Sequence, residues 1–223
     1  MANLFTQQFG IKEVADVAFY NQGDIKYNPE TGDVELTASD NKPVLVFTTL
    51  KTSSLEFTGE TAEARGGKGN AVLMSWDHSR EATLTLEDAL LSADSLATML
   101  SKGAPQLAGN NTVISIDANG FPGTYTVVGK TYARGTDGKD HLLTFLIFKA
   151  KVNSEASFEM SADGDPSTLN MTLKVLRCTS NKSDTDMGAV DGDMVKFIID
   201  DNTTNVKTPA ITFPGRSSTA QNA

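Results

Sequence analysis

The sequence predicts a mainly β protein, an antiparallel β-sandwich or barrel with one flanking α-helix. Two observations lead to this prediction. Apolar residues mostly recur at alternate positions in a chain rich in Thr, and Gly, Asn, Asp and Pro separate these stretches, which is typical of strands and turns. The chain also lacks a regular alternation of strand and helix patterns, so the sheets are expected to be antiparallel.

The clearest strand pattern runs from Thr168 to Arg177, where Leu169, Met171, Leu173 and Val175 fall on one face. Such a period of two predicts a half-buried strand. The same pattern, with about eleven strands in all, predicts further strands at Val34–Thr37, Val44–Leu50, Ser53–Thr58, Ala71–Trp76, Ala82–Leu86, Val113–Ala118, Thr124–Ala133, Leu142–Val152, Ala156–Met160 and Val195–Asp200.

One segment departs from the period of two. Ala93, Leu96, Ala97 and Leu100 have the i, i+3, i+4, i+7 spacing of one helix face. Ser92 can cap the N-terminus, and Gly103 stands where a glycine commonly ends a helix. The pattern therefore predicts a helix over about residues 92–101.

We expect a single domain over residues 1–214, followed by a flexible tail over residues 215–223. The tail contains no apolar side chain larger than Ala, so it cannot bury enough surface to order itself. A domain boundary within Lys102–Asn111, where Gly, Pro and Asn cluster, is the alternative.

Composition excludes several classes of protein. The chain has 19 Lys and Arg against 28 Asp and Glu, for a net charge of −9, which argues against tight binding to nucleic acid phosphates. Its single cysteine excludes a disulfide framework and a Cys-based zinc site, and Cys178 is expected to be a small buried side chain. The N-terminus lacks the pattern of a secretory signal, and the longest apolar stretch, Leu142–Phe148, is too short to cross a bilayer. A soluble protein made in the cytosol is therefore expected.

The Gly-rich stretch Glu63–Asn70 does not fit a phosphate-binding loop. Ala62 and Gly69 stand where that motif needs Gly and Ser or Thr, and a strand pattern follows where a helix would be needed to bind phosphate. We expect a long mobile hairpin connection, spanning Glu60–Asn70, which could contact another protein. The candidate contact residues are Glu63, Arg65, Gly66, Gly67, Lys68 and Gly69.

The run Asp184–Asp193 is acidic but lacks the ligand spacing of a calcium-binding EF-hand loop. A solvated turn is the simpler interpretation. With Asp200 and Asp201, the stretch has six acids against Lys196 alone, for a net charge of −5. The functional alternative is a surface that faces something negatively charged without binding it, formed by Asp184, Asp186, Asp191 and Asp193.

No catalytic, cofactor or metal site is expected. The two histidines, His78 and His141, each follow an Asp, but neighbours on a strand point to opposite faces. The chain shows no Ser/His/Asp order and no metal-ligand spacing. Trp76 and the Phe residues are expected mostly in the core.

The stretches Phe9–Tyr20, Pro43–Lys51, Phe57–Asn70, Leu73–Asp77 and Thr83–Ser92 resemble virion structural proteins of tailed bacteriophages, and within that group the tail tube proteins. These stretches cover about the first 100 residues.

The resemblance implies a subunit that assembles with its own copies into stacked, hexameric rings, forming a tube through which DNA passes without tight binding. The acidic residues Asp184, Asp186, Asp191 and Asp193 would then be the candidates for the surface that faces the lumen of the tube. It implies other phage tail proteins as partners: a tape measure, a baseplate and, in a contractile tail, a sheath. The virion tail, assembled in the host cytoplasm, would be its location. Deleting Ala64–Gly69 should then block stacking and leave the fold intact. A capsid decoration protein and a carbohydrate-binding or hydrolytic β-sandwich are the alternatives.

Overall fold

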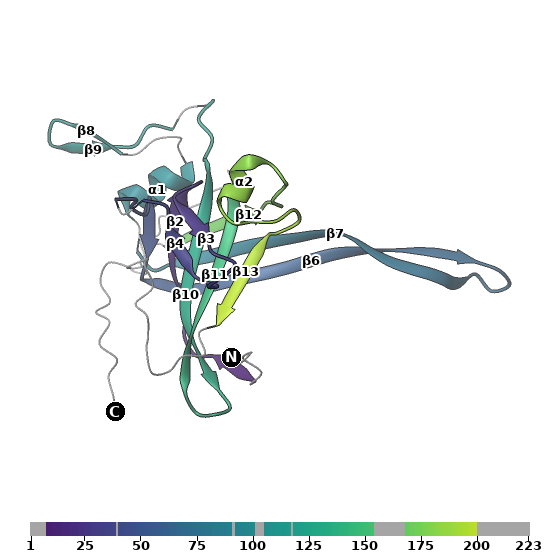
Figure 1. The fold of residues 1–223 in the computed structure, drawn as a ribbon. Helices are drawn as coiled ribbons and strands as arrows, with labels where there is room; N and C mark the ends of the chain where they lie inside the picture. The colour runs from purple at the N-terminus through teal and green to yellow at the C-terminus, as the bar shows by residue number, and fades with distance from the viewer. Residues whose placement is uncertain are drawn as a thin grey trace, which may run out of the picture.

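Antiparallel strands make up most of the described chain (Figure 1). The computed structural model describes residues 8–38, 40–90, 92–100, 105–116, 118–153 and 168–199. Its strands are β1 (Phe9–Ile11), β2 (Asp16–Asn21), β3 (Ile25–Tyr27), β4 (Val34–Leu36), β5 (Leu45–Phe47), β6 (Leu50–Gly66), β7 (Ala71–Asp88), β8 (Gln106–Ala108), β9 (Asn111–Val113), β10 (Thr124–Gly135), β11 (Asp140–Val152), β12 (Leu169–Val175) and β13 (Val195–Ile199). Its helices are α1 (Ala93–Leu100) and α2 (Lys182–Asp186).

The long hairpin β10–β11 is the spine of the main sheet. The edge of β10 that faces away from β11 pairs with β2 near one end and with β1 near the other. The edge of β11 that faces away from β10 also has two partners, β12 near Ala150 and β13 near Phe145. Four strands therefore depend on one hairpin for their hydrogen-bond partners.

The main sheet is open and folds over on itself. Its order is β5-β2-β10-β11-β12-β7-β6, with β1 and β13 attached at the sides. The outer strands β5 and β6 do not pair with each other, so the described strands do not close into a barrel. The prediction of a mainly antiparallel β fold with a flanking helix is confirmed, in its sandwich form.

The central strands are buried on both faces. Val127 of β10 and Ile147 of β11 belong to one core cluster, whereas their neighbours Val128 and Leu146 belong to a second. A strand covered on both faces is apolar at consecutive positions. This explains why Leu142–Phe148 is apolar at every position except Thr144 and does not alternate.

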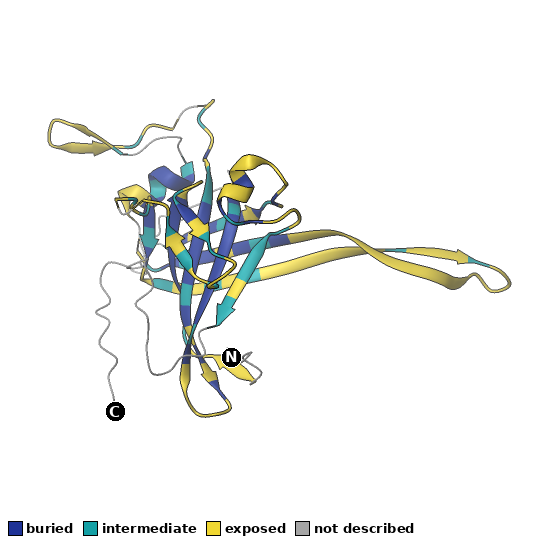
Figure 2. Cartoon of the chain, in the orientation of Figure 1, coloured by how far each residue is buried: buried dark blue, intermediate teal, exposed yellow. Residues whose placement is uncertain are grey.

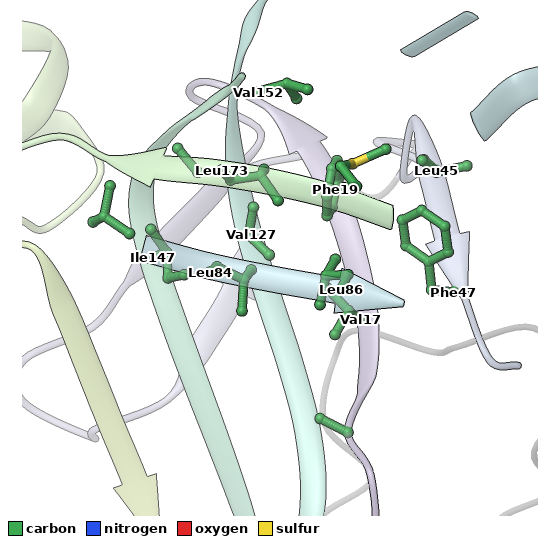
Figure 3. Close-up of a cluster of buried hydrophobic side chains, with 14 of the residues drawn as sticks. Val17, Phe19, Leu45, Phe47, Leu84, Leu86, Val127, Ile147, Val152 and Leu173 are labelled. Carbon is green, nitrogen blue, oxygen red and sulfur yellow. The ribbon is translucent and has the colours of Figure 1, made fainter. Parts of the chain in front are cut away.

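The first core cluster fills the space inside the folded sheet. Leu84 and Leu86 of β7 and Leu173 of β12 face Phe19 of β2 and Val127 of β10 (Figure 3). The predicted apolar face of β12 is confirmed, because its members are all buried: Leu169, Met171, Leu173 and Val175. Burial of each such side chain contributes about 1.5–3 kcal/mol.

The second core cluster lies on the other face of the spine, under the β3–β4 hairpin and the segment around α2. Its members include Tyr20, Ile25, Phe148, Cys178 and Met187. Helix α2 overlaps the first three residues of the run Asp184–Asp193, which was expected to be a solvated turn; residues 187–193 contain turns and no regular element. The helix begins after Asn181, whose side-chain oxygen accepts a hydrogen bond from the backbone N–H of Asp184 at 2.8 Å.

The predicted helix over about residues 92–101 is confirmed as α1. Ser92 is its N-cap: the backbone N–H of Ser95 donates to Ser92 Oγ at 3.0 Å, and the N–H of Ser92 donates to Ser95 Oγ at 3.0 Å. This reciprocal pair satisfies two backbone donors that the helix itself cannot use. Leu96 and Leu100 pack against the first core cluster, whereas Ala93 is exposed.

Several predicted elements differ from the structure. The strand expected at Val113–Ala118 ends at Val113 as β9, and residues 114–116 form no strand. Strands β1, β2, β3 and β8 were not predicted. The strand expected at Ala156–Met160, Gly103, Asp200, Asp201 and the tail over residues 215–223 lie outside the described residues.

Gly188 holds the segment after α2 against β3. Its φ of 76° is in the left-handed region, and a Cβ at this position would collide with the carbonyl oxygen of Tyr27. The contact is fixed by the backbone N–H of Tyr27, which donates to the carbonyl of Met187 at 2.9 Å. Only a residue without a side chain fits there.

We expect Gly188→Ala to lower the free energy of unfolding by about 2–5 kcal/mol, from backbone strain and overpacking together. Gly192 is the matched control, since its φ is 94° but a Cβ there has open space. Gly192→Ala should cost only about 1–2 kcal/mol. Urea unfolding followed by circular dichroism measures both, and equal losses would contradict the role of the Tyr27 contact.

Candidate functional site

Strands β6 and β7 form a long hairpin that projects from the body of the molecule (Figure 1). The connection predicted over Glu60–Asn70 is largely wrong, because the turn comprises only Gly67–Asn70. Glu63, Arg65 and Gly66 lie in β6, whereas Gly67, Lys68 and Gly69 lie in the turn. Gly67, Gly69 and Asn70 all have positive φ angles, as a tight hairpin turn requires.

The base of the hairpin is buried in the core, and the rest of the hairpin is exposed. In β7, Ala82, Leu84 and Leu86 are buried in the first core cluster, but residues 71–81 are all exposed. Figure 2 shows the same change from dark blue to yellow along the hairpin. The three strands predicted at Ser53–Thr58, Ala71–Trp76 and Ala82–Leu86 are thus parts of two long strands.

One face of the outer hairpin is apolar. Trp76 pairs across the strands with Ala62, and Met74 pairs with Ala64. A register irregularity follows, and the side chain of Leu73 comes over Gly66 on the same side, with Cδ1 3.2 Å from where a glycine Cβ would stand. We call this surface the apolar hairpin face: it comprises Ala62, Ala64, Leu73, Met74 and Trp76.

Apart from Val72, which lies opposite Arg65, the opposite face of the outer hairpin is polar and internally paired. Thr61 Oγ1 donates to the Asp77 carboxylate at 2.8 Å, and Arg65 Nε donates to the Glu63 carboxylate at 2.9 Å. Ser75 lies opposite Glu63 in the register. The contrast between the two faces indicates that one face stays in water and the other does not.

The apolar hairpin face is unusually exposed for its composition. Leu73 is 69% exposed, Met74 63% and Trp76 50%, so the expectation that Trp76 lies in the core is wrong. Phe9, Phe57, Phe121 and Phe197 are also exposed, whereas Phe19, Phe47, Phe145 and Phe148 are buried as expected. A two-stranded hairpin alone is only marginally stable in water, and neighbouring exposed apolar side chains mark a protein contact. This face is the candidate functional site.

The acidic run contains one residue that cannot act at a surface. The Asp184 side chain is only 2% exposed, so its proposed place in an exposed acidic surface is wrong. Its Oδ2 atom accepts from the backbone N–H of Thr179 at 2.7 Å and from Lys149 Nζ at 3.2 Å. Burial alone would raise the pKa of this carboxyl, but these hydrogen bonds outweigh burial and hold the pKa below its ordinary value.

The other three acids of the run are each paired with a base. Asp186 accepts from Lys182 at 2.7 Å, Asp191 from Arg177 at 3.0 Å and Asp193 from Lys196 at 2.8 Å. Arg177 lies outside the run in sequence, as does Lys149, so a charge count within the run omits them. The four acids therefore form no uncompensated negative patch.

The histidines and the cysteine are not brought together. His141 is buried beside Asp137, with Nε2 3.4 Å from the carboxylate, whereas His78 lies on the hairpin near Glu60. Within the described ranges, no group of three or more His, Cys, Asp or Glu side chains could hold a metal ion. Cys178 is buried as predicted, and burial raises the pKa of its thiol to about 11.

We expect Asp184→Asn to lower the free energy of unfolding by about 2–3 kcal/mol, because charge-assisted hydrogen bonds to Lys149 and Thr179 are lost. The folded pKa is below the unfolded one, so this stabilisation is present above the unfolded pKa and disappears as pH falls through the folded pKa. Urea unfolding at pH 7 and at acidic pH checks both effects. Asp186→Asn is the control: its exposed pair should change stability by less than about 1 kcal/mol, and an equal loss there would refute the assignment.

We also expect the Cys178 thiol to react with an aromatic disulfide reagent only as fast as the chain unfolds. The thiol is buried and largely protonated at pH 8, and the thiolate is the reactive form. Reaction in native buffer and in concentrated urea, followed by absorbance, makes the comparison. Rapid reaction of the native protein would contradict the position of Cys178 in the second core cluster.

Comparison with known proteins identifies the family of the chain. The chain matches the YomU/Tube protein family over residues 29–103 and 106–190, which include the projecting hairpin and the whole β10–β11 spine. No curated protein gives a significant match. Among the described helices, none is long and apolar enough to span a membrane. The matched ranges cover most of the sequence, and they show that the chain belongs to the YomU/Tube protein family, a family of phage-type structural tube proteins.

Proposed function

We propose that this chain is the repeating subunit of a bacteriophage tail tube, assembling with its own copies into stacked hexameric rings. Membership of the YomU/Tube protein family supports a structural tube role. The apolar hairpin face carries the proposal, because it is a large exposed surface on an element that is not stable by itself. Packing against another copy would cover it.

The position of the hairpin favours assembly in rings or tubes rather than in closed pairs. The hairpin extends well beyond the body (Figure 1), and we infer that its apolar face packs against a different surface of the neighbouring copy. A contact between two unlike surfaces is heterologous, and it repeats until a ring closes or a filament grows. The outer edge of β6 is also unpaired within the described sheet, which offers backbone groups to a neighbour.

The charge of the chain suits a conduit for DNA. Six copies at −9 each give 6 × (−9) = −54 per ring, and a negative wall repels phosphates so that DNA passes without being held. Asp186, Asp191 and Asp193 are each neutralised by an ion pair, which argues against the prediction that these residues supply the negative charge facing the lumen of the tube. The overall charge, rather than that run, supports the conduit.

The remaining features of the proposal follow from a tail tube role. The partners are a tape measure, a baseplate and, in a contractile tail, a sheath. Assembly takes place in the host cytoplasm and the finished tube is part of the virion. The role is structural and requires no cofactor.

We expect the double variant Met74→Ser with Trp76→Ser to raise the protein concentration needed for assembly by more than a hundredfold. Each lost side chain removes about 1.5–3 kcal/mol of burial, and 1.4 kcal/mol corresponds to a factor of ten. Negative-stain microscopy and light scattering measure assembly. These substitutions are milder than deletion of Ala64–Gly69, which would remove the end of β6 and most of the turn.

The control is Ser75→Ala, on the polar face of the same hairpin, which should assemble as the unmodified chain does. Circular dichroism should show the same fold for all three proteins, since the outer hairpin contributes nothing to the core. Trp76 is the only tryptophan, so its fluorescence should shift to shorter wavelength on assembly. Tubes of normal length from the double variant would refute the proposal.

A further inference from the structure

A second, shorter arm projects from the body. Strands β8 and β9 pair with each other alone, through the register Gln106↔Val113 to Ala108↔Asn111. In Figure 1 this arm and the long hairpin extend to opposite sides of the body. All residues of both strands are exposed (Figure 2), so the arm, residues 105–116, has no core of its own.

The arm carries no charged residue. Asp117 is the only Asp, Glu, Lys or Arg between Lys102 and Lys130, although 21% of the whole chain is charged. Exposed surface of a soluble domain ordinarily carries about 25–35% charged residues. Charge is instead depleted in the cores of protein interfaces. We refer to residues 105–116 as the neutral arm.

The neutral arm also exposes large apolar side chains. Leu107 is 83% exposed, Ile116 63% and Val113 41%. The remaining side chains are mostly small or amide-bearing, and such side chains can be desolvated at far lower cost than ions. The arm thus has the composition of a segment that becomes covered.

A second copy of the chain is the partner that best fits a neutral arm. A basic partner would be met by acidic residues, and an acidic chain has these in excess. Two copies that each carry −9 repel one another, and a contact made without charge adds nothing to that repulsion. This choice of partner rests on the proposed function.

We propose that the neutral arm is a second subunit–subunit contact, separate from the apolar hairpin face and docking on another copy of the chain. The two elements lie on opposite sides of the body and differ in character, since the hairpin keeps one polar face and the arm has no charged side chain at all. Each subunit then holds its neighbours through two independent contacts, so loss of one weakens the assembly without altering the other.

Two kinds of variant test the proposal: one adds charge to the arm with side chains of nearly the same shape, and the other removes an apolar side chain. Gln106→Glu with Asn110→Asp introduces two acids at exposed positions, and Leu107→Ser removes the most exposed apolar side chain. Gln22→Glu, at an exposed turn between β2 and β3, is the matched control for one added charge. All are made in the full chain, and thermal unfolding should be unchanged because every residue of β8 and β9 is exposed.

We expect Leu107→Ser to raise the concentration needed for assembly at least tenfold, and the two added acids to do the same. The effect of the acids should be partly reversed in 1 M salt, where charge interactions are screened within about 3 Å, and Gln22→Glu should behave as the unmodified chain. Sedimentation velocity over a range of concentrations gives the values.

The outcomes separate the two proposals. Arm variants that assemble normally, beside a Met74→Ser with Trp76→Ser variant that does not, would overturn the arm contact and leave the tube role standing. Failure of the arm variants beside a normal hairpin variant would support the arm contact and remove the observation that carries the proposed function. An unmodified chain that remains monomeric at millimolar concentration would overturn both.

Discussion

Burial of the β10–β11 hairpin on both faces is the constraint on which the rest of the structure depends. Consecutive residues such as Val127 and Val128 enter different core clusters, so each face must be covered by a separate layer. The folded-over strands β12 and β7 cover one face, and β3, β4 and the α2 segment cover the other. Because these layers already cover both faces of β10–β11, the outer β6–β7 hairpin and the β8–β9 arm lie outside the core, where they can contact another molecule.

The fold was predictable where a local pattern reports one-sided burial. Strand β12 alternates because one of its faces is covered, and α1 has both its periodicity and its Ser92 cap within a few residues. Helix α2 was missed because it has only five residues and depends on its Asn181 cap and on the contact that the segment after it makes with Tyr27 of β3. Three short strands were predicted where the structure has the two long strands β6 and β7. The outer parts of these strands are exposed and are held by pairing with each other, so their hydrophobic pattern does not show that the strands continue.

The sequence indicated which stretch of the chain contains the candidate site, but it did not identify the side chains that form it. The stretch from Glu63 to Gly69 belongs to the projecting hairpin, yet Trp76, which marks the contact, was expected in the core. Exposure depends on where the neighbouring layers end, and this is set by the whole sheet. The acidic run failed for a related reason: Lys149 and Arg177, which neutralise two of its acids, are close only in space.

Strand β7 is continuous from Leu86, inside the core, to the exposed apolar hairpin face. Its backbone pairs with β6 along most of this length, and the pairing is irregular between Thr58↔Glu81 and Glu60↔His78, where Ser79 has a φ of 56°. A load applied by a neighbour would pass along the paired strands and through this irregularity into the sheet. In mechanical terms, the hairpin acts as a beam fixed at one end, and the stiffness of any tube built from it would derive from the same hydrogen bonds that hold the subunit together.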